Sequence, residues 1–140
     1  MGDQHHMLQL MRSDGTLLKS PQWLDESMAL ALFRGIHLTR LFDKKAVYLQ
    51  RTGQLGTYPS SLGQEAVFVA AGMAMQAEDR YCPYYRDQGA LLHRNVRACE
   101  LLAIWGGNEI GHAYQNNAYD LPLCVPIATQ CTIAAGIAYG

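Results

Sequence analysis

The longest regular pattern in the sequence is a run of about thirty residues, 21–50, in which apolar residues recur at the spacing of an α-helix. Ser20 and Pro21 stand where a helix favours a hydroxyl cap and a proline in its first position. Asp25 and Glu26 lie near the positive end of the helix dipole. The sequence therefore predicts one long amphipathic helix, whose apolar face is formed by Leu24, Met28, Ala31, Leu38, Leu41, Phe42, Ala46 and Leu49.

The length of 140 residues allows one domain or part of one. Hydrophobic residues make up 49% of the chain and charged residues 16%, a charged fraction well below the average of about 25% for soluble proteins. These figures exclude a disordered chain and predict that much of the surface is covered. We expect residues 1–19 to form an extended arm, with a short strand over residues 7–11 and a turn at 13–16. Residues 20–140 would be an incomplete domain.

Charge and targeting signals limit the partners and the cellular location that the sequence predicts. The net charge is −1 and no block of like charges is present, so neither nucleic acid nor a membrane surface is an expected partner. The sequence has no signal-peptide core and no run of about 18 apolar residues, which favours a cytoplasmic protein. The cysteines and histidines lack metal-binding spacing, so we expect four reduced thiols and no metal site. The cysteines are Cys82, Cys99, Cys124 and Cys131.

After the long helix, short helices alternate with turns, and residues 106–122 lose all periodicity, as functional or mobile loops often do. Gly35 is the expected weak point of the long helix. The other expected elements are a glycine-rich break at 51–59, a capping box of Ser61 and Gln64 before a helix over 66–74, an extended segment or strand at 81–85, helices over 89–94 and 98–105, the second capped by Asn95, and a helix over 127–139.

Residues 84–89 place Tyr85 and Arg86 at the junction between the extended segment and a helix. A guanidinium can hold two oxygens of a diphosphate while a neighbouring hydroxyl takes a third, and a helix start adds backbone amides. Taken by themselves, these residues favour the alternative, a surface pair between Arg86 and Asp87 beside core tyrosines.

Two further segments are compatible either with contact to a ligand or with a purely structural role. The glycines of residues 53–66 would let the backbone approach a ligand, or would serve a turn and a tight helix cap. Residues 126–130 begin a helix behind Pro126, whose free amides would contact a cofactor or would be only a helix start.

In this order, the segments resemble the alpha subunit of the thiamine diphosphate-dependent first component of 2-oxoacid dehydrogenase complexes, most closely the pyruvate-type bacterial form. The resemblance runs from about Leu24 to Gly140 and rests on residues 51–58, 62–66, 84–89 and 125–130. It implies a three-layer α/β fold that binds thiamine diphosphate. This chain would be its mainly helical amino-terminal part, from a truncated product or one segment of a split or incomplete gene.

The resemblance also implies roles for individual residues. Tyr85 and Arg86 match residues that hold the cofactor diphosphate, and Val125 and Ile127 match residues that meet the aminopyrimidine through backbone atoms. The loop histidine of the family corresponds to Ile110 here. The candidate for proton transfer is therefore His112, two residues away, and the alternative is a solvated loop histidine.

The family binds magnesium through a Gly-Asp-Gly…Asn motif, expected some thirty residues beyond Gly140. No metal ligand is therefore assigned in this chain, and the isolated chain is expected to bind the cofactor weakly or not at all. Some relatives hold a potassium ion where Pro126, Thr129 and Gln130 would match. Because Cys124 stands where an oxygen ligand is usual, we do not expect that ion here.

The implied reaction is oxidative decarboxylation of a 2-oxoacid, pyruvate first and branched-chain 2-oxoacids or acetoin as alternatives, with acyl transfer to a lipoyl group. The implied partners are a beta subunit in a heterotetramer, the lipoyl-bearing acyltransferase and a second alpha subunit, in agreement with the low charge content. The rival hypothesis is a non-catalytic fragment that acts only as an interaction module through its helices.

Overall fold

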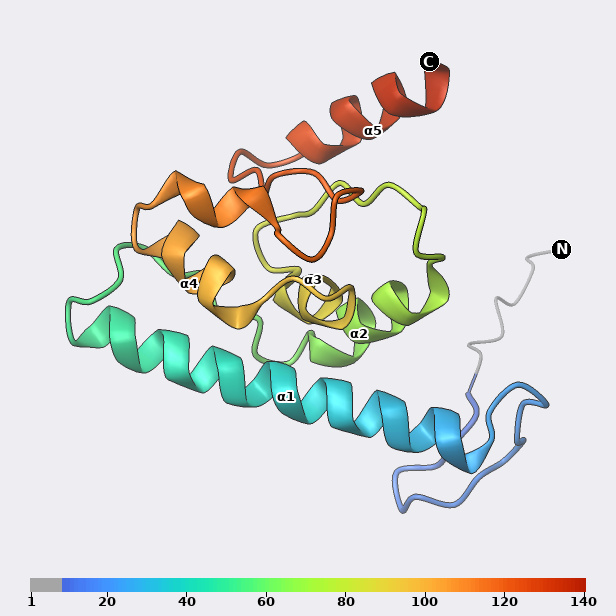
Figure 1. Cartoon of the computed structure of the whole chain (residues 1–140). Helices are drawn as coiled ribbons and strands as arrows, with labels where there is room; N and C mark the ends of the chain where they lie inside the picture. The colour runs from blue at the N-terminus through green and yellow to red at the C-terminus, as the bar shows by residue number, and fades with distance from the viewer. Residues whose placement is uncertain (1–8) are drawn as a thin grey trace, which may run out of the picture. The chain divides into compact units, whose positions relative to one another are not determined.

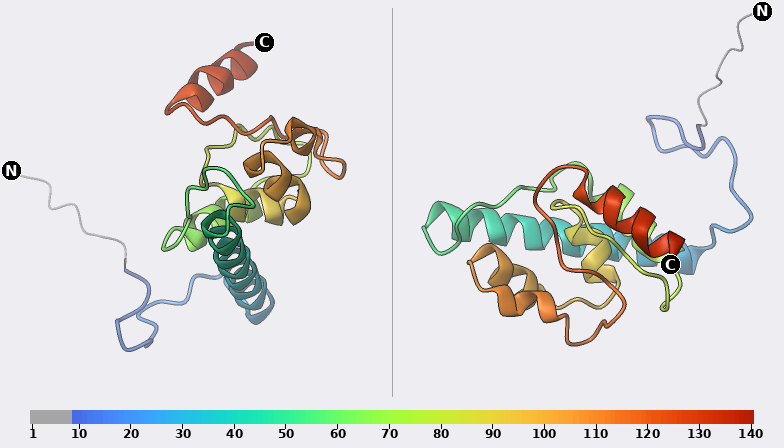
Figure 2. Two further views of the ribbon diagram at one scale, coloured as in Figure 1. Left: turned by 90° about the vertical axis from the view of Figure 1, so that its left-hand side faces the viewer. Right: turned by 90° about the horizontal axis from the view of Figure 1, so that it is seen from above.

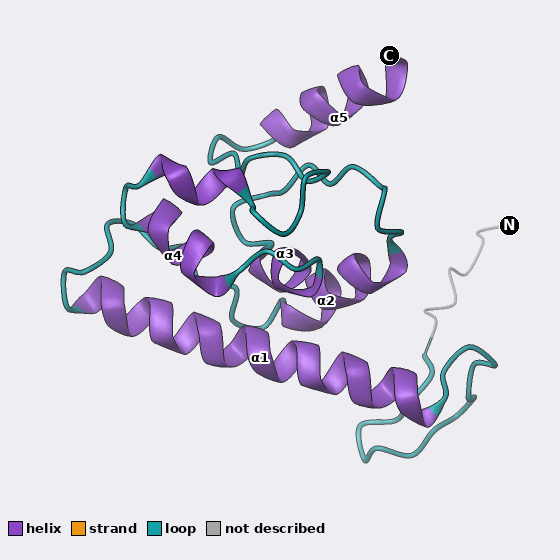
Figure 3. Cartoon of the chain, viewed as in Figure 1, coloured by secondary structure: helices purple, strands orange, loops and turns teal. Residues whose placement is uncertain are grey.

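The computed structural model describes residues 9–140, which form helices joined by loops and turns (Figure 1). His5, His6 and the first part of the expected strand at 7–11 lie outside the described residues. The described part contains no strand (Figure 3), which confirms that the chain is mainly helical. The elements are α1 (Glu26–Arg51), α2 (Glu65–Ala74), α3 (Gln88–His93), α4 (Ala98–Trp105), the 3-10 helix η1 (Glu109–Ala113) and α5 (Thr129–Tyr139).

The chain divides into two compact units, the first ending at Ala31 and the second beginning at Leu32. In the first unit, the expected turn brings Met11 and Leu17 into an isolated antiparallel bridge. Gly15 stands at φ +87° in this turn, a backbone conformation that a residue without Cβ adopts at no cost. The extended arm over residues 1–19 remains a prediction of the sequence.

Helix α1 begins at Glu26 and not at Pro21. The carboxylate of Asp25 accepts the backbone N–H of Met28 at 2.7 Å, which is the bond of an N-cap side chain. The predicted cap at Ser20 is therefore wrong. Serine and aspartate are both favoured at caps, and the folded backbone places the aspartate where the amide can reach it.

In the second unit, α2, α3 and α4 lie on one side of α1 (Figures 1 and 2). The buried stripe of α1 is Thr39, Phe42, Asp43 and Ala46, which keeps the predicted helical spacing but includes two polar residues. Leu38 and Leu41, expected on the buried face, are 53% and 52% exposed. The hydrophobic core consists of Phe42, Ala46, Leu55, Leu91, Val96, Leu101, Trp105, Tyr114 and Leu123.

Two glycines allow helices to approach each other closely. A Cβ atom at Gly35 in α1 would lie 2.6 Å from Cγ1 of Val69 in α2. A Cβ atom at Gly72 in α2 would lie 3.1 Å from the Cα of Ala90 in α3. Gly35, expected as the weak point of the long helix, is therefore the point where α1 and α2 pack together.

The capping box predicted for α2 is absent. Ser61 is fully buried, and both its N–H and its hydroxyl donate to Asp43. The first residue of α2, Glu65, instead accepts the N–H of Gly63 at 2.9 Å. The distant partner on α1 captures the serine because a buried carboxylate requires several donors.

The later helices are close to their predicted bounds but begin differently. The cap of α4 is Arg97, whose N–H donates to Glu100 at 2.9 Å, while the expected cap Asn95 stands at φ +68°. Helix α5 begins at Thr129 after a left-handed Ala128, so Pro126 does not lead it. None of the residues of α5 is buried.

The predicted loop over residues 106–122 contains η1 and is anchored by buried polar contacts. Nη2 of Arg94 donates to Oδ1 of Asp120 at 2.7 Å, and their side chains are 4% and 0% exposed. Asn117 donates to the same carboxylate at 2.7 Å, and the N–H of Gln115 donates to Glu100 at 2.8 Å. These contacts fix the return of the loop toward the core.

The four cysteines are free thiols in the structure, as expected. Cys82 and Cys124 are half-buried, whereas Cys99 and Cys131 are exposed. Among residues 9–140, no helix is both long enough and apolar enough to cross a membrane.

Candidate functional site

An isolated parallel bridge between Tyr84 and Cys124 brings two of the predicted cofactor segments together. The segment 81–85, expected to be extended or a strand, contributes only this one bridge. A bond from the N–H of Leu121 to the carbonyl of Tyr81, at 2.9 Å, ties the same two segments upstream. The N–H of Asp87 donates to the carbonyl of Tyr84 at 3.0 Å, so a turn that carries Tyr85 and Arg86 follows the bridge directly.

Arg86 is half-buried, and its surroundings leave its charge without a balancing carboxylate. Nη1 of Arg86 donates to the backbone carbonyl of Ser60, and the guanidinium lies 5.5 Å from the ring centroid of Tyr85. The ion pairs in the described part of the chain involve Arg40, Arg94 and Arg97 and do not include Arg86. A half-buried cation of this kind is suited to an anionic ligand.

The surface pair between Arg86 and Asp87 is absent. Asp87 is 4% exposed and accepts the hydroxyl of Tyr81 at 2.6 Å and the N–H of Tyr84 at 2.7 Å. Burial raises the pKa of the Asp87 carboxyl, although these two hydrogen bonds oppose the shift. Asp87 therefore holds together the backbone that carries Arg86 and does not neutralise it.

Tyr85 and the residues across the bridge differ in exposure. The ring of Tyr85 is half-buried against the core and lies 3.9 Å from the ring of Tyr84, centroid to centroid. Val125 and Ile127 are 55% and 78% exposed. Their side of the bridge is therefore open to a ligand or to another polypeptide.

The glycine-rich loop reaches Arg86 through a cluster of residues that sequence reasoning missed. The carboxylate of Asp43 on α1 is 3% exposed and accepts four hydrogen bonds from the loop. They come from the hydroxyl of Tyr58 at 3.0 Å, the hydroxyl of Ser60 at 2.7 Å, and the N–H and hydroxyl of Ser61 at 2.7 and 3.2 Å. A carboxylate at helical spacing beside the apolar residues Phe42 and Ala46 was the signal that would have found it.

The same loop is fixed at two further points. The N–H of Gly56 donates to the carbonyl of Trp105 in α4 at 3.0 Å, and the rings of Tyr58 and Trp105 meet edge to face at 5.8 Å. Burial raises the pKa of Tyr58, Asp43 raises it further, and the charge of Arg86 lowers it. The phenol therefore stays neutral and remains the donor in its hydrogen bond to Asp43.

His112, the candidate for proton transfer, is not a solvated loop histidine. It lies on η1, half-buried, with its ring 6.4 Å from that of Tyr114, and its Nε2 is buried without a hydrogen-bond partner. Among the described contacts, none links His112 to Arg86. Ile110, which the resemblance sets against a histidine of the family, is 76% exposed.

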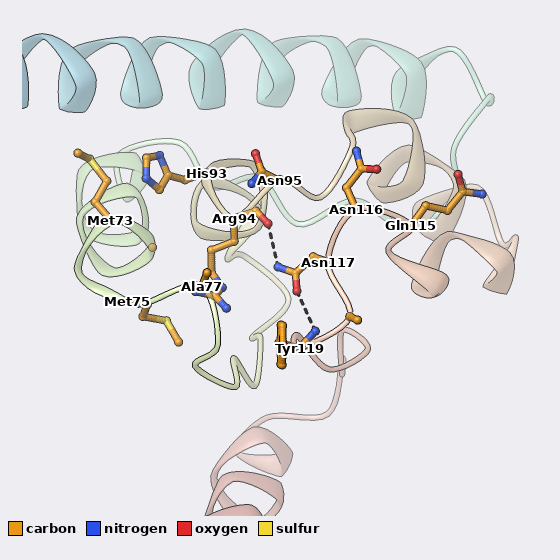
Figure 4. A pocket seen from close by; sticks show the side chains of 12 residues that line it. Met73, Met75, Ala77, His93, Arg94, Asn95, Gln115, Asn116, Asn117 and Tyr119 are labelled. Atoms are coloured by element: carbon orange, nitrogen blue, oxygen red, sulfur yellow. Dashed lines mark hydrogen bonds between the residues drawn. The ribbon is translucent and has the colours of Figure 1, made fainter.

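A shallow cavity of about 520 Å³ lies elsewhere, between the ends of α2 and α3 and residues 115–119 (Figure 4). Methionines and amides line it, and none of the predicted cofactor residues belongs to its wall. The side chain of Asn117, shown in the figure, already donates to the carbonyl of Arg94 and accepts the N–H of Tyr119. No cluster of His, Cys, Asp or Glu within residues 9–140 is arranged to hold a metal ion.

Comparison with known proteins gives consistent matches. The family model described as "Dehydrogenase E1 component" matches residues 34–140. The pyruvate dehydrogenase E1 component subunit alpha of Mycoplasma pneumoniae is 36% identical over 104 residues, which are 74% of this chain and 29% of the relative. The protein of the same name in Bacillus cereus is 29% identical, over 98% of this chain and 38% of the relative.

One relative carries a different substrate in its name. The 3-methyl-2-oxobutanoate dehydrogenase subunit alpha of Mycobacterium tuberculosis is 32% identical, over 94% of this chain and 36% of the relative. The chain thus spans about a third of the length of the curated relatives it matches.

Proposed function

This chain belongs to the dehydrogenase E1 component family, and from that premise we propose that it acts within the alpha subunit of a pyruvate dehydrogenase. The reaction would be oxidative decarboxylation of pyruvate with transfer of the acetyl group to a lipoyl arm. Relatives named for pyruvate dehydrogenase support this substrate. The relative named for 3-methyl-2-oxobutanoate makes a branched-chain 2-oxoacid the second candidate. Acetoin is a third alternative, supported only by the sequence motifs.

The residues present suit thiamine diphosphate, the cofactor that the resemblance implies. A diphosphate needs a cation that no carboxylate already neutralises, and Arg86 is such a cation in the described part of the chain. Val125 and Ile127 follow Cys124, the other partner of the parallel bridge, and are exposed. This unneutralised guanidinium beside the bridge is the observation that carries the proposal.

Within this site, Arg86 and Tyr85 would bind the diphosphate, and the backbone at Val125 and Ile127 would orient the aminopyrimidine. Thiamine diphosphate, when bound, supplies the electron sink for the decarboxylation. His112 stays the candidate for proton transfer, and its Nε2 is buried without a hydrogen-bond partner. We assign no magnesium ligand among residues 9–140.

The fold and partners follow as part of the same proposal. The parallel pairing of Tyr84 with Cys124 is the kind found in the central sheet of a three-layer α/β fold. This bridge and the resemblance to the family both support that fold for the whole subunit. Large apolar side chains exposed along α1 support burial against other subunits, among them Phe33, Leu38 and Tyr48. We propose a beta subunit, a second alpha subunit and the lipoyl-bearing acyltransferase as partners, in a heterotetrameric enzyme.

The test is a titration of thiamine diphosphate with magnesium into the alpha subunit assembled with its beta subunit. Intrinsic fluorescence reports binding, because Trp105 contacts the loop at Gly56 and Tyr58. Arg86→Ala should weaken binding about 10- to 100-fold, since hydrogen bonds to a charged group contribute about 1.5–3 kcal/mol.

The matched control is Arg34→Ala, which removes an exposed arginine of α1 and should leave the affinity unchanged. Equal affinities for the wild type and Arg86→Ala would reject the cofactor site. That result would instead favour the rival hypothesis, an interaction module without turnover.

A further inference from the structure

We propose that Asp43 is a positioning residue that acts through the loop 58–61 to hold the guanidinium of Arg86 in its diphosphate-binding orientation. The inference rests on the proposed function of Arg86 and adds a residue on a different element. Asp43 lies in the interior of α1, far from residues 84–86 in sequence.

The first step is the contact between the carboxylate and the loop. All four hydrogen bonds that Asp43 accepts come from Tyr58, Ser60 and Ser61, and both of its oxygens take part. Asp43 forms no ion pair in the part of the chain that the structure describes. A carboxylate that is 3% exposed must keep these donors, because losing them would leave a buried charge uncompensated.

The second step is the contact between the loop and Arg86. The hydroxyl of Ser60 donates to Asp43 at 2.7 Å, and the carbonyl of the same residue accepts Nη1 of Arg86. Fixing the serine side chain on α1 therefore fixes the direction in which its carbonyl points. One guanidinium nitrogen is held by this carbonyl, which aligns the planar fork and leaves its other donors for a ligand.

The third step is the rigidity of the surroundings. Tyr58 contacts the ring of Phe42 and that of Trp105, so the phenol that donates to Asp43 cannot turn away without disturbing the core. A loop held on two helices loses little conformational freedom when a ligand binds. The arrangement therefore preorganises Arg86, and its loss should reduce affinity and not the chemical step.

The experiment compares thiamine diphosphate affinity in the assembled enzyme for the wild type, Asp43→Asn, Arg86→Ala and the double variant. Asp43→Asn keeps the shape but removes the charge and replaces one of the two accepting oxygens by an amide nitrogen, which cannot accept the hydrogen bond that this oxygen received. It should weaken binding about tenfold and raise the KM for the cofactor, with kcat at saturating cofactor within about twofold of wild type. In the Arg86→Ala background, the same change should weaken binding by less than about twofold.

The matched control is Glu100→Gln, which changes a carboxylate that is 5% exposed and hydrogen-bonded like Asp43 but lies outside the loop. It should leave cofactor affinity unchanged. An equal loss from Asp43→Asn in both backgrounds would overturn the positioning role while leaving the proposed function intact. If Arg86→Ala has no effect, the proposed function fails and this inference fails with it.

Should Asp43→Asn not fold, Tyr58→Phe and Ser60→Ala replace it, since each removes a single hydrogen bond to the carboxylate. Each should weaken cofactor binding about two- to fivefold in the wild-type background and not in the Arg86→Ala background. Unchanged affinity in both variants would overturn the inference.

Discussion

Substituting Gly35 by alanine tests whether α1 and α2 are as closely packed as the structure has them. The new Cβ would lie 2.6 Å from Cγ1 and 3.5 Å from Cγ2 of Val69, a side chain that is completely buried. Carbon atoms pack at about 3.5–4.0 Å, so one helix must shift or the valine must leave its rotamer. Overpacking of this kind costs about 1–3 kcal/mol.

An opposing gain reduces the net effect. Alanine in a helix interior is more stable than glycine by about 1 kcal/mol, so Gly35→Ala should destabilise the chain by about 1 kcal/mol net. In a Val69→Ala background both Cγ atoms are gone, and the same substitution fills part of the space that they left. There it should stabilise by about 1 kcal/mol, a coupling of about 2 kcal/mol between the two positions.

Urea unfolding followed by far-ultraviolet circular dichroism measures the four free energies of this cycle. Gly136→Ala is the matched control, because Gly136 lies in α5 and a Cβ there would meet nothing within 4 Å. It should give only the helix-propensity gain. If Gly35→Ala stabilises the wild type as much as the Val69→Ala variant, the close packing of α1 on α2 is refuted.

Three further predictions follow from buried polar groups. Asp120→Asn should lower the free energy of unfolding by about 3 kcal/mol or more, because it breaks the buried pair with Arg94; a loss below about 1 kcal/mol in urea unfolding would contradict this. The hydrogen bond from Arg40 lowers the pKa of Glu65, so the stability this carboxylate contributes is full above its ordinary pKa of 4.5 and is lost as the pH falls through the lowered value. Glu65→Gln should therefore flatten the acid side of a profile of thermal stability against pH, and an unchanged profile would reject the assignment. Burial raises the pKa of Cys82, so mass spectrometry should find its alkylation by iodoacetamide slower than that of the other three thiols, and not equal to theirs.

The sequence predicted much of the helical pattern, because helices depend on local spacing. Residues 98–105 form α4 as predicted, and the buried stripe of α1 keeps the expected period. Helix starts were less accurate. Several residues near each start are able to cap, and the contacts that choose between Ser20 and Asp25 form only in the folded chain.

The motif at residues 84–89 also came from the sequence, as did the resemblance that the family match confirms. The roles of Tyr85, Arg86, Val125 and Ile127 stay predictions. What the sequence left open was which partner Arg86 takes, and the structure gives a backbone carbonyl, not the neighbouring Asp87.

Tertiary structure alone decided the surroundings of that motif. In the sequence, Asp43 is one of several charged residues in a predicted helix. In the folded chain it is buried against the loop 58–61. The bridge between Tyr84 and Cys124 joins segments whose spacing in sequence carries no sign of their contact. Local propensity is encoded residue by residue, whereas hydrogen-bond partners and buried charges depend on which distant groups the packed helices bring within about 3 Å of one another.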